Sequence, residues 1–133
     1  MEVSLKNQVA IITGSSSGIG AGIAKSMAES GATVVVNFPF DCARTQAEEV
    51  LKEISDKSGN GIVYMCDVSK EDQVEKMFQD IVSQFGTVDI LVNNAGIQKD
   101  SKFTEMTIDQ WNAVIGVNLT GQFLCAREAI KEF

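Results

Sequence analysis

Short apolar runs alternate with longer segments in which apolar residues recur at helical spacing, and this alternation constrains the fold most. The four runs are Val9–Ile12, Thr33–Val36, Ile62–Cys66 and Ile90–Val92. Continuous apolar runs of this length are typical of parallel strands that are buried on both faces. A helical pattern follows each run. We therefore expect an α/β fold, a doubly wound parallel sheet with about four strands and four helices.

Glycines and polar residues mark where these helices should begin and end. Gly31 and Gly86 follow the first and third helical segments and are expected to end them. Three helix starts are predicted from capping residues. They are Asp41 for the second helix, a capping box of Ser69 and Asp72 for the third, and one of Thr107 and Gln110 for the fourth. Residues 96–106 are expected to form a loop, and the last helix is expected to run to the end of the sequence.

Composition excludes several classes of function. The formal net charge is −7, and no cluster of Lys and Arg is present that could bind a nucleic-acid backbone. The chain has no His and three widely spaced Cys, so a metal site or a Ser-His triad is not expected. No apolar run is long enough for a membrane span or a signal peptide. A cytoplasmic protein that does not bind membranes is the expectation.

The glycine-rich segment between the first strand and the first helix is a candidate phosphate site. Gly14 can turn the chain off the strand, Gly18 can let backbone approach a pyrophosphate, and Gly20 can let the helix pack closely. Backbone N–H groups at the helix start would then face the anion. Ala21 stands where a Walker loop requires Lys. The alternative is a Gly/Ser turn that binds no ligand.

Four motifs together resemble the short-chain dehydrogenase/reductase family. They are Thr13-Gly14-x-x-x-Gly18-x-Gly20, Asp67-Val68, Asn93-Asn94-Ala95-Gly96 and Asn118-Leu119-x-Gly121. The resemblance extends from about Leu5 to Phe133 and is nearest to the branch of bacterial glucose 1-dehydrogenases and 3-oxoacyl-carrier-protein reductases. It implies a Rossmann fold, NAD or NADP as cofactor, and a small-molecule substrate. It also implies assembly of the full-length protein as a dimer or tetramer.

The resemblance assigns roles to particular residues. Asp67 and Val68 are expected to hold the adenine. Asn118 is expected to kink its helix and to anchor a water of the proton relay. Cofactor contacts are implied for Gly14, Ser16, Ser17, Gly18, Ile19, Gly20, Asn37, Asp67, Val68, Asn94, Ala95 and Gly96. The alternative for each motif is a structural turn or a locally satisfied polar side chain.

The choice between NAD and NADP stays open at Asn37, which stands where such folds often place an acid after the second strand. Asn37 can hydrogen-bond a ribose but does not repel a 2′-phosphate. Pro39 stands where an Arg would recruit NADP, and Arg44 is interpreted as a solvated helix residue.

The catalytic Ser and the Tyr-x-x-x-Lys motif of the family do not occur within residues 1–133. The one Tyr, Tyr64, lies in the third predicted strand and is interpreted as a packing residue. We therefore interpret residues 1–133 as a dinucleotide-binding domain truncated before the catalytic segment, which should lack turnover by itself. The full enzyme would transfer a hydride between the nicotinamide and a secondary alcohol or carbonyl compound, with a sugar such as glucose as one candidate. The alternatives are a stand-alone dinucleotide-binding module and a non-catalytic interaction subunit.

Overall fold

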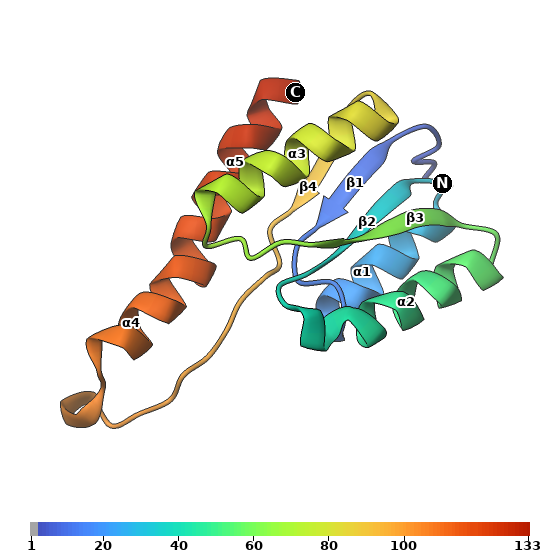
Figure 1. The fold of residues 1–133 in the computed structure, drawn as a ribbon. Coiled ribbons are helices and arrows are strands. Elements are labelled where there is room, and N and C mark those ends of the chain that lie inside the picture. The colour runs from blue at the N-terminus through green and yellow to red at the C-terminus, as the bar shows by residue number, and fades with distance from the viewer. Residues whose placement is uncertain (1–2) are drawn as a thin grey trace.

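The computed structural model describes residues 3–133 and contains a four-stranded parallel sheet in the order β3-β2-β1-β4 (Figure 1). The strands are β1 (Val9–Ile12), β2 (Thr33–Phe38), β3 (Asn60–Met65) and β4 (Ile90–Val92). All three ladders are parallel, and β1 pairs with β2 on one side and with β4 on the other. The predicted parallel sheet is confirmed. β2 continues two residues beyond its predicted run, and β3 begins two residues before its own predicted run.

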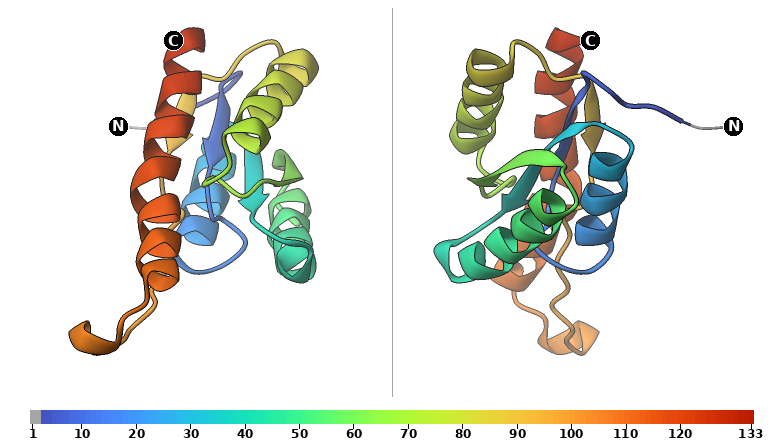
Figure 2. Two further views of the ribbon diagram at one scale, coloured as in Figure 1. Left: turned by 60° about the vertical axis from the view of Figure 1, so that its left-hand side comes forward. Right: turned by 90° about the vertical axis from the view of Figure 1, so that its right-hand side faces the viewer.

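Helices cover both faces of the sheet. They are α1 (Gly18–Glu29), α2 (Arg44–Asp56), α3 (Glu71–Phe85), α4 (Ile108–Ile115) and α5 (Gly121–Glu132), with short 3₁₀ turns at Asp41–Ala43 and Phe103–Glu105. Figure 2 shows α1 and α2 together on one face, and α3 and α5 together on the other. Of the described residues, no helix is long and apolar enough to cross a membrane.

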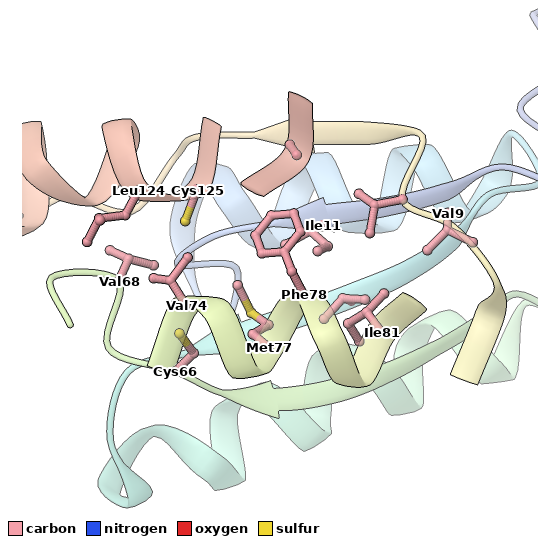
Figure 3. Close-up of a cluster of buried hydrophobic side chains, with 13 residues drawn as sticks. Val9, Ile11, Cys66, Val68, Val74, Met77, Phe78, Ile81, Leu124 and Cys125 are labelled. Carbon is pink, nitrogen blue, oxygen red and sulfur yellow. The ribbon is translucent and has the colours of Figure 1, made fainter. Parts of the chain in front are cut away.

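Alternating strand residues supply two separate cores, one on each face. Ile11 and Val35 point into the core beneath α3 and α5, where Val74, Met77 and Phe78 interlock with them (Figure 3). Ala10, Ile12 and Val34 point into the opposite core beneath α1 and α2. β1 is fully buried along its length because both faces are covered. The helical periodicity predicted this face of α3 correctly.

The structure confirms some of the predicted helix ends and corrects others. Gly86 ends α3 with a φ of +86°, and Thr107 forms a complete capping box with Gln110 at the start of α4. Gly31 follows the end of α1 with a φ of +106°. Asp41 does not cap α2, because it begins a 3₁₀ turn and its carboxylate pairs with Arg44.

The capping box predicted from Ser69 and Asp72 is wrong. Lys70 is the N-cap of α3, and no side chain caps that helix. Ser69 instead donates both its backbone N–H and its hydroxyl to Asp67 Oδ1. The short-range bonds of an Asx turn therefore replaced the longer box.

The last helix is interrupted by a π-helical turn, η3, at Gly116–Thr120. The sequence predicted one continuous helix, whereas α4 and α5 lie on either side of this turn. Asn118 sits within η3, and Gly121 begins α5. Gly121 has room only for hydrogen, because a Cβ there would lie 2.7 Å from Val68 Cγ2. Such π turns are rare and concentrate at functional sites.

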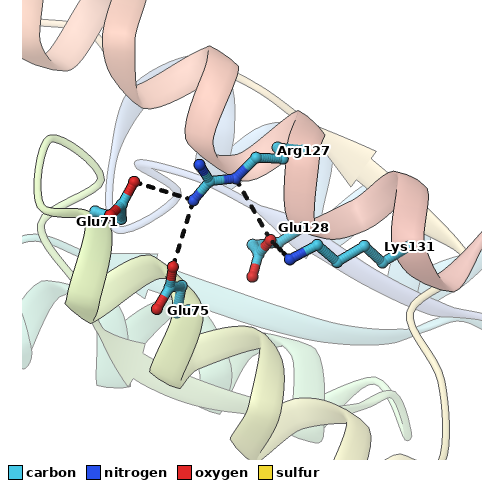
Figure 4. A network of polar contacts seen from close by, with 5 residues as sticks. All are labelled: Glu71, Glu75, Arg127, Glu128 and Lys131. Carbon is cyan, nitrogen blue, oxygen red and sulfur yellow. Dashed lines mark hydrogen bonds and ion pairs between the residues drawn. The ribbon is translucent and has the colours of Figure 1, made fainter.

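Ion pairs join α5 to α3 on the surface of the second core. Arg127 of α5 contacts Glu71 and Glu75 of α3 at 3.2 and 3.4 Å, whereas Lys131 pairs within α5, 2.5 Å from the nearly buried Glu128 (Figure 4). Exposed pairs of this kind stabilise a fold by about 1 kcal/mol at most. Their role is therefore to fix how α5 lies against α3, while the apolar core holds the two helices together.

Candidate functional site

A cleft with a volume of about 1330 Å³ opens at the carboxyl ends of the four strands. Its walls are the turn after β1, the segments after β2 and β3, the loop after β4, and the helical residues of α4 and η3. Because β2 lies on one side of β1 and β4 on the other, the connections leave β1 and β4 toward opposite faces. Open α/β sheets bind ligands at this switch point.

The glycine turn after β1 forms one wall of the cleft. Gly14 and Gly18 have φ angles of +62° and +58°, a region that favours glycine. A Cβ on Gly14 would lie 2.8 Å from Ala95 Cα, so the turn packs directly against the loop after β4. A Cβ on Gly18 would meet no atom within 4 Å. Gly18 is therefore exposed, beside the lining residues Ser17 and Ile19, although it is not itself among the residues that line the cleft.

The start of α1 presents polar and apolar groups to the same cleft. Ser16, Ser17 and Ile19 all line it. Ser17 is the N-cap of α1 but makes no side-chain capping bond, and the first turn contains no acidic residue. The helix therefore keeps its positive N-terminal end uncompensated. Ile19 is 79% exposed, an unusual exposure for an isoleucine at the edge of a cleft.

Asn94 and Thr13 join the loop after β4 to the end of β1. Asn94 Nδ2 donates to the backbone oxygens of Thr13 and Gly14, each at 3.0 Å. The Thr13 hydroxyl accepts from the backbone N–H groups of Asn94 and Ala95 at 3.0 and 2.9 Å. Asn94 therefore braces the end of β1 against the loop after β4. The same bonds place the backbone of Ala95 and Gly96 along the cleft.

Asp67 and Val68 form the wall after β3. Asp67 Oδ1 is occupied by Ser69, and the Asp67 backbone N–H donates to Gln73 Oε1 at 2.8 Å. Val68 is 4% exposed and packs against the core beneath α3 and α5. Both residues line the cleft. Their predicted contact with an adenine stays a prediction.

Asn37 lines the cleft, and its predicted contact with a ribose stays a prediction. It is 1% exposed, and both polar atoms of its side chain are bonded to backbone groups inside the protein. A hydrogen bond from this amide to a ribose would require breaking one of those bonds. The Asn37 side chain thus bonds to the backbone of the turn after β1, at Gly14, and to the backbone at the end of β3, at Tyr64 and Cys66.

Asn118 brings η3 to the loop after β4. Its Oδ1 accepts from the backbone N–H of Ile97 at 2.8 Å, and its Nδ2 donates to the Ile97 carbonyl at 2.9 Å. Gly96 lies next to this pair, with Asn118 Oδ1 3.5 Å from the position of a Cβ. The π-helical turn η3 lies where the resemblance implied a kink at Asn118, although the sequence did not predict a π turn. The predicted water of a proton relay stays untested.

Tyr64 is remote from the chemistry of the cleft. It lies in β3, and its hydroxyl donates to Asp80 Oδ2 of α3 at 2.5 Å. Burial, followed by this hydrogen bond, raises the pKa of Tyr64 above its usual value, so it does not ionise near neutrality. Within residues 3–133, no cluster of His, Cys, Asp or Glu has the arrangement of a metal site.

Several lining residues were missed by the sequence reasoning. Lys70 follows β3 without belonging to a motif, and Asp109 and Asn112 lie on α4. The available signal for Lys70 was position alone, since any residue directly after a parallel strand reaches this edge of the sheet. Thr13 and Ser15, at 2% and 0% exposure, were named only as parts of the turn. Buried hydroxyl groups in a turn indicate internal hydrogen bonds.

Comparisons with known proteins agree with this geometry. The family model described as short chain dehydrogenase matches residues 8–133. The chain is 43% identical, over 126 residues, to the 3-oxoacyl-(acyl-carrier-protein) reductase FabG of two Staphylococcus epidermidis strains. The aligned region covers 95% of this chain and 51% of each relative.

A solved structure extends the comparison to three dimensions. A double mutant of a Serratia marcescens short-chain dehydrogenase/reductase matches with a TM-score of 0.90 and 30% identity. That match covers 97% of this chain and 52% of the other chain. This chain thus spans about half the length of the relatives it matches. Since the family match extends over nearly all of its residues and includes the cleft, the chain belongs to the short-chain dehydrogenase family.

Proposed function

We propose that this chain forms the dinucleotide-binding part of an NAD- or NADP-dependent oxidoreductase. Members of its family use these cofactors. The observation that carries the proposal is the convergence of the Gly14–Ser17 turn, the Asp67–Val68 segment and the Asn94–Gly96 loop on one cleft. This cleft lies at the sheet edge where ligands of such folds bind.

The geometry of the turn fits a pyrophosphate. Backbone at Gly18 is open, and the uncapped N-terminus of α1 offers N–H groups and a positive helix end. Gly14 and Gly20 are packed too closely for any side chain, so the turn keeps its shape without a ligand. A preformed site binds more tightly because less ordering is needed on binding.

The remaining walls would hold the two ends of the dinucleotide. Asp67 and Val68 would contact the adenine, whereas Ala95 and Gly96 would pass close to the nicotinamide ribose. Asn118 would support this loop through Ile97 and so position the reacting end. When bound, the nicotinamide supplies or accepts the hydride. The contribution of this chain is to bind, orient and shield that group.

The reaction would interconvert a secondary alcohol and a carbonyl compound. The loop that begins at Ile97 and the exposed face of α4 border the cleft where the substrate would enter. A 3-oxoacyl thioester and a sugar such as glucose are the two substrates to compare. The first follows from the name of the Staphylococcus epidermidis relatives, and the second follows from the motif resemblance.

Turnover by the route that the family resemblance implies would need the Tyr-x-x-x-Lys motif, which does not occur in residues 1–133, and Tyr64 is bonded to Asp80. We expect the 133-residue chain to bind a dinucleotide without turnover. We also expect the full-length protein to act in the cytoplasm as a dimer or tetramer. The alternative is a binding module or interaction subunit without catalysis. The two hypotheses differ in one outcome, because the alternative predicts that the full-length protein also binds a dinucleotide without turnover.

Calorimetric titration with NAD⁺ and NADP⁺ tests the cofactor site. Gly18→Asp places a carboxylate beside the pyrophosphate in a backbone conformation that Asp tolerates, so we expect folding with loss of both affinities. Gly18→Asn has the same shape without the charge and should bind more tightly than Gly18→Asp. Gly86→Asp is the matched control, since Gly86 also has a positive φ and open surroundings but ends α3. Absence of binding to folded wild-type protein would contradict the proposal.

A further inference from the structure

The amide of Asn37 joins two walls of the cleft. Its Oδ1 accepts from the Gly14 backbone N–H at 2.9 Å, in the turn after β1. Its Nδ2 donates to the carbonyls of Tyr64 and Cys66 at 3.3 and 3.1 Å, at the end of β3. The acceptor therefore faces the glycine turn, and the two donors face the segment that leads to Asp67.

The backbone of Asn37 adds two further bonds to the same turn. Its N–H donates to Ser15 Oγ at 3.0 Å, and its carbonyl accepts from the Ser15 N–H at 2.9 Å. The Ser15 hydroxyl in turn donates to the Ile12 carbonyl at 2.7 Å. Ser15 is 0% and Asn37 is 1% exposed, so none of these bonds competes with bulk water.

Only an amide satisfies this arrangement. A carboxylate at position 37 has no proton to offer the carbonyls of Tyr64 and Cys66, and a Leu would remove all three side-chain hydrogen bonds. Leaving buried polar groups unpaired costs far more than a typical hydrogen bond contributes. The hydrogen bonds inside the protein therefore determine which residue type is suitable at position 37.

We propose that Asn37 is a positioning residue that fixes the Gly14 turn relative to the Asp67 segment, and that it does not itself distinguish NAD from NADP. This inference rests on the proposed function, because it concerns the affinity of the same cleft. Its consequence is that losing the Asn37 amide weakens both dinucleotides by the same factor. A residue in contact with the 2′ position of the ribose would instead change their ratio.

Asn37→Asp separates these two roles. We expect the affinities for NAD⁺ and NADP⁺ to fall together, by about tenfold or more, with their ratio within about twofold of wild type. A direct contact predicts the opposite pattern, since a carboxylate accepts from ribose hydroxyls and repels a 2′-phosphate. A selective loss of NADP⁺ binding in Asn37→Asp would overturn the inference. Asn60→Asp, the same change at the exposed start of β3, should leave both affinities unchanged.

Ser15→Ala provides a second test if Asn37→Asp does not fold. It removes the hydroxyl that accepts from the Asn37 N–H and leaves the Asn37 amide in place. We expect a smaller loss that is again equal for the two dinucleotides. Wild-type affinity for both dinucleotides in folded Ser15→Ala, or an altered ratio, would overturn the inference. Failure of the wild-type protein to bind either dinucleotide would instead contradict the proposed function, so the two failures are distinguishable.

Discussion

The β1–β2 region, residues 9–38, and the β4–α5 region, residues 90–133, form opposite sides of the cleft and are packed very differently. In the first region, Ile11, Ile12 and the central residues of β2 are 0% exposed. Thr13, Ser15 and Asn37 are buried as well, and each bonds to backbone groups through its side chain. The turn that faces the ligand is therefore fixed by the same interactions that hold the sheet together.

The β4–α5 region is more open. All three residues of β4 are only partly buried, and β4 pairs with β1 alone. Trp111, Leu119 and Phe123 are 54%, 63% and 59% exposed. Asn118 connects this region to the loop after β4, but its bonds with Ile97 are accessible to water.

This contrast suggests a division between a rigid cofactor side and a more adjustable substrate side. A dinucleotide is common to many enzymes, and a preformed site for it is an advantage. Loops tolerate variation better than buried turns do, and they commonly carry specificity. If this division is correct, equivalent substitutions should cost much more stability in the β1–β2 region than in the β4–α5 region.

Gly20→Ala should produce the largest effect. A Cβ on Gly20 would lie 2.5 Å from the Gly14 carbonyl oxygen, which is backbone and cannot move aside cheaply. We expect a loss of about 3 kcal/mol in the free energy of unfolding, together with weaker dinucleotide binding. Urea denaturation measures the first quantity.

Two other glycines serve as controls for Gly20→Ala. Gly22 lies in the same helix, and a Cβ there would meet no atom within 4 Å. Gly22→Ala should therefore stabilise the chain by up to about 1 kcal/mol. Gly96→Ala, in the β4–α5 region, has its nearest contact at 3.5 Å and should change stability by about 0.5 kcal/mol or less. A loss at Gly96 equal to that at Gly20 would remove the contrast between the two regions.

Thr13→Val should have the next largest effect, because it removes the acceptor of the Ala95 backbone N–H and one of the two acceptors of the Asn94 backbone N–H, which also donates to the Val92 carbonyl. The side-chain shape is nearly unchanged, so a loss of about 2 kcal/mol would report the hydrogen bonds alone. Thr13→Ser should recover most of it. Thr45→Val on the exposed face of α2 is the control for the residue type and should change stability little.

Asn118→Ala should cost less, about 1 kcal/mol, because the two bonds to Ile97 are partly exposed to solvent. The informative readout is amide hydrogen exchange. We expect faster exchange at Ile97 and unchanged exchange at Gly14. Accelerated exchange throughout β1 would show that the two sides of the cleft are not independent.

Sequence patterns predicted the sheet and most helices because burial on two faces leaves a strong periodic signal, as along α3. The π turn was missed for a physical reason. Asn118 makes its bonds with Ile97, which is 21 residues away, and no local pattern reports a contact at that separation. The caps predicted at Asp41 and Ser69 failed because Arg44 and Asp67 are closer partners.

The candidate site was predictable only in part. Glycines in the turn after β1 and the Asn94 motif identify the cleft, because positive φ angles and close packing leave few alternatives to glycine. The direction of a polar side chain is a different matter. Asn37 follows a strand run whether its amide faces a ligand or the interior, and only the positions of Gly14 and Cys66 decide between them.

The three thiols should have the smallest effect on stability at any pH below 9, but they differ in reactivity. Burial raises the pKa of Cys66 and of Cys125 to about 12, and both lie in the core beneath α3 and α5, whereas Cys42 is exposed. In the folded state, therefore, one thiol should react with a disulfide reagent at pH 8. All three should react once the chain is unfolded.

The same pKa shifts predict how stability depends on pH. Unfolding exposes both buried thiols, whose pKa then falls to an ordinary value near 9. Between pH 9 and 12 the unfolded state binds fewer protons than the folded state, so the free energy of unfolding decreases as pH rises. Below pH 9 the contribution is fully present and nearly constant. Cys66→Ala loses packing at every pH but should show a shallower alkaline decline, whereas Cys42→Ala should keep the wild-type slope. An unchanged slope in Cys66→Ala would show that folding does not raise the pKa of this thiol.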